Sequence, residues 1–168
     1  GNFVIAGGVS AVSIAKWNGI SWSAVGINGM SAPIYALAVY NNELYAAGQL
    51  YSGGSIYGGC IAKWDGANWT NITGGFGIPS NINALAVYNS ELYASGSFNS
   101  FANYIAKWNG TTWTTVGTGM NNIVTALGVY SSELYAGGTF SNAGGTPANN
   151  IAKWNGSTWS AVGGGVNN

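Results

Sequence analysis

The sequence predicts an all-β fold, a β-propeller built from four-stranded antiparallel blades. Two recurring phrases carry this prediction. IAKW, followed by Asn-Gly or Asp-Gly and a second Trp, starts at Ile14, Ile61, Ile105 and Ile151, with spacings of 47, 44 and 46 residues. A second phrase, ALAVYNNELYAAG in its first copy, precedes the last three copies of IAKW. Repeats of about 40 to 50 residues with several short strands each are typical of propellers.

Each full unit is expected to contain four strands, which we call A to D. Strand A reads ALAVY and is apolar on both faces, so we expect burial on both. A two-residue turn such as Asn41-Asn42 leads into strand B, ELYAAG, and a variable loop leads into strand C, IAKW. An Asn-Gly turn such as Asn18-Gly19 then leads into strand D, as in TWSAVG. No stretch has helical spacing of apolar residues.

The repeats divide a single propeller, or propeller segment, of residues 1–168 into four units. Their approximate bounds are 1–30, 31–78, 79–120 and 121–168. FVIAGG at residues 3–8 aligns with ELYAGG at 133–138, so the first blade is expected to contain strands B, C and D and to lack strand A. An unpaired edge beside an apolar face invites pairing with another chain.

Three explanations of the missing strand stay open. The chain is a segment of a longer repeat protein, or it takes a strand from another copy to form a dimer or filament, or it closes as a four-bladed ring with a defective blade.

The repeats also resemble known families. LYAGG at residues 134–138, followed by Trp154 and Trp159, resembles the kelch type of propeller blade. The phrase IAKW(N/D)GxxW more closely resembles repeats of large secreted bacterial surface proteins. This resemblance implies propeller blades and a place outside the cell.

The composition excludes several functional classes. Charged residues make up 5% of the chain, the net charge is zero, and Arg and His are absent. There is therefore no basic surface for nucleic acid, no apolar run that would span a membrane, and no His-dependent nucleophile. Cys60 is alone and the four acids are scattered, so we expect no disulfide, metal site, cofactor or enzymatic activity. Low charge with abundant Asn, Ser, Thr and Gly favours an extracellular or cell-surface protein.

The tryptophans and lysines of the IAKW phrase have two interpretations each. The Trp pairs are either platforms for sugar rings or packing between blades, and their fixed place in the repeat favours packing. The lysines either form cross-strand pairs with Glu43, Glu91 and Glu133 or belong to a catalytic site, and radial repetition favours pairs. The four pairs of tryptophans are Trp17 and Trp22, Trp64 and Trp69, Trp108 and Trp113, and Trp154 and Trp159.

If the chain binds a specific ligand, we expect the site in the loops that differ between units. Tyr51 and Tyr57 in the second B–C loop and Phe76 in the following irregular stretch are the candidates. The alternative is that these loops are tolerated length variation.

We therefore expect a non-enzymatic extracellular repeat scaffold for adhesion, surface display or self-assembly, whose partners are other copies of itself or the rest of a longer chain. One alternative is a glycan-binding propeller lectin with sites between blades. Another is an accessory propeller of a larger secreted enzyme.

Overall fold

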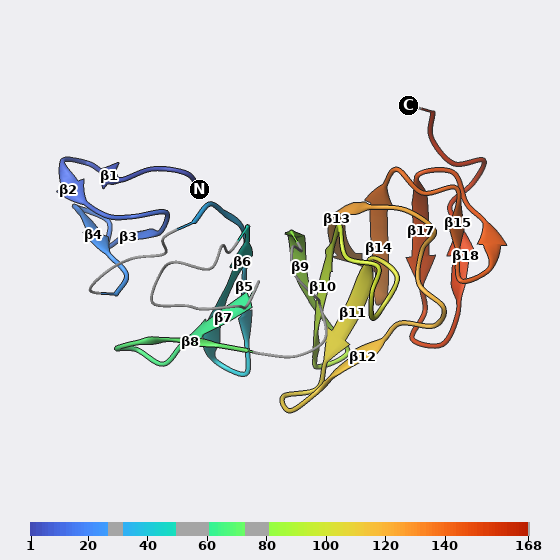
Figure 1. Cartoon of the computed structure of the whole chain (residues 1–168), viewed down its shortest axis with the longest axis horizontal. Coiled ribbons are helices and arrows are strands. Elements are labelled where there is room, and N and C mark those ends of the chain that lie inside the picture. The colour runs from blue at the N-terminus through green and yellow to red at the C-terminus, as the bar shows by residue number, and fades with distance from the viewer. Residues whose placement is uncertain (27–31, 50–60, 73–80, 168) are drawn as a thin grey trace.

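The computed structural model describes residues 1–26, 32–49, 61–72 and 81–167, and every regular element in these ranges is a β-strand. Units 2, 3 and 4 each contain a four-stranded antiparallel sheet whose strands pair in chain order. The first is β5 (Ile34–Tyr40), β6 (Glu43–Gly48), β7 (Ile61–Trp64) and β8 (Trp69–Asn71). The second is β9 (Ile82–Tyr88), β10 (Glu91–Gly96), β11 (Ile105–Trp108) and β12 (Trp113–Thr115). The third is β13 (Val124–Tyr130), β14 (Glu133–Gly138), β17 (Ile151–Trp154) and β18 (Trp159–Ala161). The sheets follow one another in chain order (Figure 1).

The turn between the first two strands of each sheet has the expected two residues. Asn41 and Asn42 both have positive φ, +49° and +63°, and Tyr40 pairs with Glu43 across the turn. Two successive residues in this conformation match the right-handed twist of the flanking strands. The same conformation recurs at Asn89-Ser90 and Ser131-Ser132.

The hairpin between the last two strands closes through the side chain of its first loop residue. In unit 2, Asp65 Oδ1 accepts hydrogen bonds from the backbone amides of Ala67 and Asn68 at 2.8 and 2.6 Å. These bonds lower the pKa of the Asp65 carboxyl. Gly66 has φ +102°, which a side chain would disfavour. The Asn-Gly and Asp-Gly signals therefore mark the hairpins correctly.

The expectation that strand A is buried on both faces is wrong. Tyr40 and Tyr88, at the ends of β5 and β9, are buried, whereas the equivalent Tyr130 of β13 is 72% exposed. On the opposite face, Leu37 and Val39 of β5 are exposed. A sheet face is buried only where a neighbouring unit supplies side chains, and within the described residues these positions have no such neighbour.

The prediction for unit 1 also needs correction, because residues 3–8 do not form strand B. They contribute β1 (Ile5–Ala6), which turns back through Gly7 and Gly8 to pair with β2 (Val9–Ser10). This small hairpin corresponds to β15 (Asn142–Ala143) and β16 (Thr146–Pro147), which lie in the loop between β14 and β17. The correct alignment is therefore FVIAGG with FSNAGG at 140–145.

Backbone hydrogen bonds establish this equivalence. Ser13 donates to the carbonyl of Phe3 at 2.8 Å, as Asn150 donates to that of Phe140 at 2.8 Å. The Gly1 amine donates to the carbonyl of Ser13 at 3.2 Å, as the Gly138 amide donates to that of Asn150 at 2.9 Å. Gly1 thus takes the place of Gly138, the last residue of strand B in unit 4. Within the described residues, unit 1 consequently shows neither strand A nor strand B, and β3 (Ala15–Trp17) pairs with β4 (Trp22–Ala24) alone.

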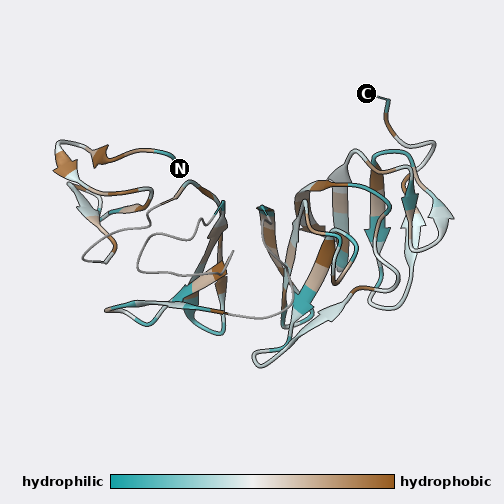
Figure 2. Cartoon of the chain, viewed as in Figure 1, coloured by the Kyte–Doolittle hydropathy of each residue, from teal (hydrophilic) through white to brown (hydrophobic). Residues whose placement is uncertain are grey.

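The core lies between successive units. One cluster joins units 1 and 2 through Ile14, Val25 and Ala46, and two larger clusters join unit 2 to unit 3 and unit 3 to unit 4. Hydrophobic segments accordingly occur in the strands of each sheet and in the β1–β2 hairpin (Figure 2). Each unit depends on its neighbours for burial, as in other repeat proteins.

Candidate functional site

The Trp pairs pack across the hairpins formed by strands C and D. Trp64 lies opposite Trp69, and Trp154 opposite Trp159, in the strand registers. The ring centroids of the four pairs are separated by 5.2 to 5.4 Å in tilted arrangements, within the range of favourable aromatic contacts.

These pairs also pack against the preceding unit. Trp69 Nε1 donates to the carbonyl of Val25 at 3.0 Å, and Trp159 Nε1 donates to that of Val116 at 3.0 Å. A Cβ added at Gly117 would lie 3.2 Å from the Trp154 ring, so the glycine permits close approach. The packing interpretation of the tryptophans is therefore confirmed for these contacts.

Unit 1 has no preceding unit among the described residues, and its Trp pair is open. Trp17 is 51% exposed and Trp22 41% exposed, whereas both tryptophans of units 3 and 4 are buried. Here aromatic rings are accessible to a partner.

A Glu–Lys–Tyr cluster recurs once in each complete unit. The ion pairs are Lys63–Glu43 and Lys107–Glu91 at 2.9 Å and Lys153–Glu133 at 3.0 Å. The predicted cross-strand pairing is therefore confirmed. Each carboxylate belongs to a different sheet, and we see no convergence of acids among the described residues.

The tyrosine of each cluster donates to the same carboxylate, as Tyr45 does to Glu43 at 3.1 Å. The hydrogen bond from Lys63 is the main reason why the pKa of Glu43 is lowered. Burial, followed by the bond to Glu43, raises the pKa of Tyr45 to about 12. The cluster therefore favours an ionised carboxylate and a protonated phenol, a structural arrangement rather than a general acid and base poised near neutral pH.

Lys16 is the exception to this pattern. It is exposed on β3, and no carboxylate pairs with it in the part of the chain that the structure describes. The absence of strand B from unit 1 explains this, because strand B supplies the glutamate in the other units.

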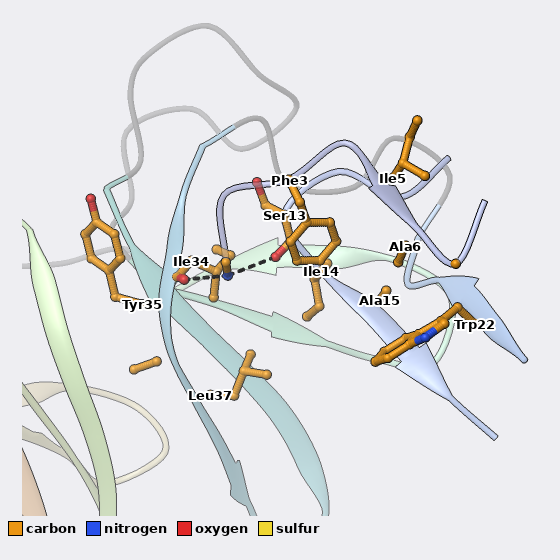
Figure 3. Close-up of a pocket in the computed structure, with 13 residues that line it drawn as sticks. Phe3, Ile5, Ala6, Ser13, Ile14, Ala15, Trp22, Ile34, Tyr35 and Leu37 are labelled. Carbon is orange, nitrogen blue, oxygen red and sulfur yellow. Dashed lines mark hydrogen bonds between the residues drawn. The ribbon is translucent and has the colours of Figure 1, made fainter. Parts of the chain in front are cut away.

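An apolar pocket lies between unit 1 and strand β5 (Figure 3). Its volume is about 660 Å³, and Phe3, Ile14 and Leu37 are among the residues that line it. At its edge the Gly1 amine donates to the carbonyls of Ile34 and Ser13, at 2.6 and 3.2 Å. Partial burial lowers the pKa of this amine. Sequence reasoning missed this pocket, because it placed residues 3–8 in strand B.

The loop candidates Tyr51, Tyr57 and Phe76, and Cys60, lie outside the described residues. Within those residues, no group of three or more His, Cys, Asp or Glu side chains could hold a metal ion. No helix that could cross a membrane occurs there either.

No protein-family model and no curated protein matches the chain. Solved structures do match. One is the crystal structure of a computationally designed protein, Ika8, with a TM-score of 0.50 and 16% sequence identity over 80% of this chain. The match spans 37% of the designed protein's length. At this identity the likeness concerns the fold alone.

Proposed function

We propose that the chain is a non-enzymatic repeat scaffold of the β-propeller type, related to kelch-like repeats of secreted bacterial surface proteins. Its sheets act as blades, and its role is adhesion, surface display or self-assembly outside the cell. The low charge and polar, uncharged composition support this location.

The observation that carries the proposal is the recurrence of one contact between units. The Trp pairs of units 2 and 4 each bind the end of strand D in the unit before them, at Val25 and Val116. The Trp pair of unit 1 is open, and the equivalent Val162 of unit 4 contacts no following unit within the described residues. Units that carry complementary surfaces of this kind can associate head to tail with further units of the same type.

Light scattering coupled to size-exclusion chromatography over a concentration series tests this proposal. We expect the wild-type chain to associate with rising concentration and the double variant Trp17→Ser/Trp22→Ser to stay monomeric. Ile20→Ser is the matched control, because Ile20 lies in the same hairpin at 86% exposure, and it should associate as the wild type does. A wild-type chain that is monomeric at all concentrations would contradict self-assembly.

Glycan binding is the alternative, and the exposure of Trp17 and Trp22 favours it specifically, because aromatic rings stack on sugar faces. A glycan array with the same three proteins separates the two functions. Binding that disappears only in the double variant, from a wild-type protein that remains monomeric, would favour a lectin.

A further inference from the structure

We infer that a pocket between units 2 and 3 is a binding site for a neutral sugar ring, the terminal residue of a glycan. The pocket has a volume of about 350 Å³ and is lined by the A–B hairpin of unit 2 and the C–D hairpin of unit 3. Both units lie inside the array, between units 1 and 4. The site is therefore separate from the exposed Trp pair of unit 1, and it does not depend on self-assembly.

The first observation is a buried hydroxyl group at the pocket. Tyr40, at the end of β5, is 4% exposed and lines the pocket, and its hydroxyl makes no hydrogen bond within the described residues. This hydroxyl faces the opposite wall, because a Cβ added at Gly110 would lie 3.8 Å from it. The equivalent Tyr88 donates to the carbonyl of Ser132 in unit 4 at 3.2 Å. A buried hydroxyl without a partner is costly, so Tyr40 is suited to a ligand that supplies the missing acceptor.

The second observation is an indole N–H group contributed by unit 3. Trp108 is 8% exposed, lines the pocket and makes no hydrogen bond among the described residues. Two neighbouring units thus each present one unpaired donor to the same space. The rest of the wall includes Tyr45 and Ile72, which pack with Tyr40 and Trp108 in one apolar cluster. Apolar walls with a few polar groups are typical of small-molecule sites, and they match the C–H groups and oxygens of a sugar.

The third observation is the balance of charge at the pocket. Lys63 and Glu43 both line it and pair at 2.9 Å, and their side chains remain 38% and 34% exposed. The carboxylate can accept a further hydrogen bond from a ligand hydroxyl, and the ammonium group has further N–H groups to donate. Because the two charges cancel, the site favours a neutral ligand, whereas Glu43 would repel an anion. A sugar hydroxyl both donates and accepts, so it matches both partners.

The size of the pocket limits the ligand to one ring. Its volume of about 350 Å³ is at the lower end of the range of about 300–1,000 Å³ for small-molecule sites. Asn41 and Thr111 line the pocket from its two walls, and both are exposed to solvent. A glycan attached to the bound ring can therefore leave the pocket between them.

An NMR titration tests the site with three probes, the methyl glycosides of glucose, galactose and mannose. At least one should shift the backbone amides of Tyr40, Glu43 and Thr111 saturably, with Kd below about 10 mM. The variant Trp17→Ser/Trp22→Ser should bind that sugar as the wild type does, because its substitutions lie in unit 1. The inference is overturned if none of the three sugars binds in this way, or if binding disappears in the unit 1 variant.

Two tyrosine variants test the buried hydroxyl. Tyr40→Phe should weaken sugar binding about five- to tenfold, because it removes a donor from the pocket. Tyr88→Phe is the matched control and should leave sugar affinity unchanged, because Tyr88 does not line this pocket. The effects on stability should be reversed: Tyr88→Phe loses the hydrogen bond to Ser132 and should lower Tm, whereas Tyr40→Phe loses none and should not. Equal effects of the two variants on sugar affinity would contradict the assigned site.

A charge variant tests the preference for a neutral ligand. The wild-type chain should bind the methyl glycoside of glucuronic acid more weakly than that of glucose. Glu43→Gln leaves the charge of Lys63 unbalanced, so it should reverse this preference, and Glu91→Gln, the equivalent change in unit 3, should not. A wild-type chain that prefers the glucuronide, or a Glu43→Gln variant with unchanged preference, would show that the neutral sugar is the wrong ligand.

Discussion

Replacing Trp159 should destabilise the protein far more than replacing its equivalent in unit 1, Trp22. Trp159 is 5% exposed, and its indole donates a buried hydrogen bond to the carbonyl of Val116. Replacing a buried aromatic residue by Ala removes its transfer free energy and leaves a cavity, at a cost of about 3–5 kcal/mol. Trp22 is 41% exposed and makes no hydrogen bond through its indole among the described residues. We expect Trp22→Ala to cost about 1–2 kcal/mol, because solvent fills the space and no closed cavity forms.

Urea denaturation of the two variants, followed by circular dichroism, measures both costs. In thermal denaturation, the expected difference of about 2 kcal/mol should separate the Tm values of Trp22→Ala and Trp159→Ala by about 4–8 °C. Trp159→Phe separates the hydrogen bond from the packing, because it keeps an aromatic ring but leaves the Val116 carbonyl without its donor. We expect this variant to cost about 1–3 kcal/mol. Equal destabilisation by Trp22→Ala and Trp159→Ala would refute the idea that each Trp pair depends on the unit before it.

Three further predictions concern the backbone and the charged clusters. A Cβ at Gly138 would clash with the Ile123 carbonyl oxygen, so Gly138→Ala should lower the free energy of unfolding by about 1–3 kcal/mol, whereas Gly164→Ala, in open space, should have little effect on urea denaturation. Lys63→Ala should lower the free energy of unfolding by about 0.2–1 kcal/mol, and Lys16→Ala should lower it less, because Lys16 has no carboxylate partner among the described residues. Thermal denaturation of both variants at low salt measures this difference. A larger loss of stability for Lys16→Ala would contradict the pairing. The folded-state pKa of Glu43 is lowered, so the stability that its carboxylate contributes should be lost as pH falls below the unfolded pKa of about 4.3. The pKa of Tyr45 is raised to about 12, so the stability that its phenol contributes should be lost as pH rises from about 10 to about 12. Tm measured against pH should show a shallower acid limb in Glu43→Gln and a shallower alkaline limb in Tyr45→Phe, and unchanged limbs would refute the assignment.

Local features were readable from the sequence because their causes lie within a few residues. Asn41-Asn42 and Asp65-Gly66 mark hairpins through their own backbone preferences and side-chain hydrogen bonds. The Glu–Lys pairs follow from the register that these hairpins impose on neighbouring strands.

The predicted alignment of FVIAGG with strand B was wrong because the same short pattern occurs at two places in the repeat. Ala-Gly-Gly ends strand B in ELYAGG at 133–138 and also occurs in the β15–β16 hairpin, in FSNAGG at 140–145, so FVIAGG fits both short patterns. The bonds of Ser13 to Phe3 and of Gly1 to Ser13 separate the two, and these bonds belong to the folded loop.

The sequence by itself determined the four strands of units 2, 3 and 4, their order, their two kinds of hairpin and the Glu–Lys pairs across them. Only the tertiary structure decided which copy of each repeated residue is covered. Trp22 and Trp159 occupy the same place in nearly identical phrases, yet Trp22 is exposed and Trp159 is buried. The reason is physical: a hairpin closes through its own residues, whereas burial requires a second unit to lie against the first.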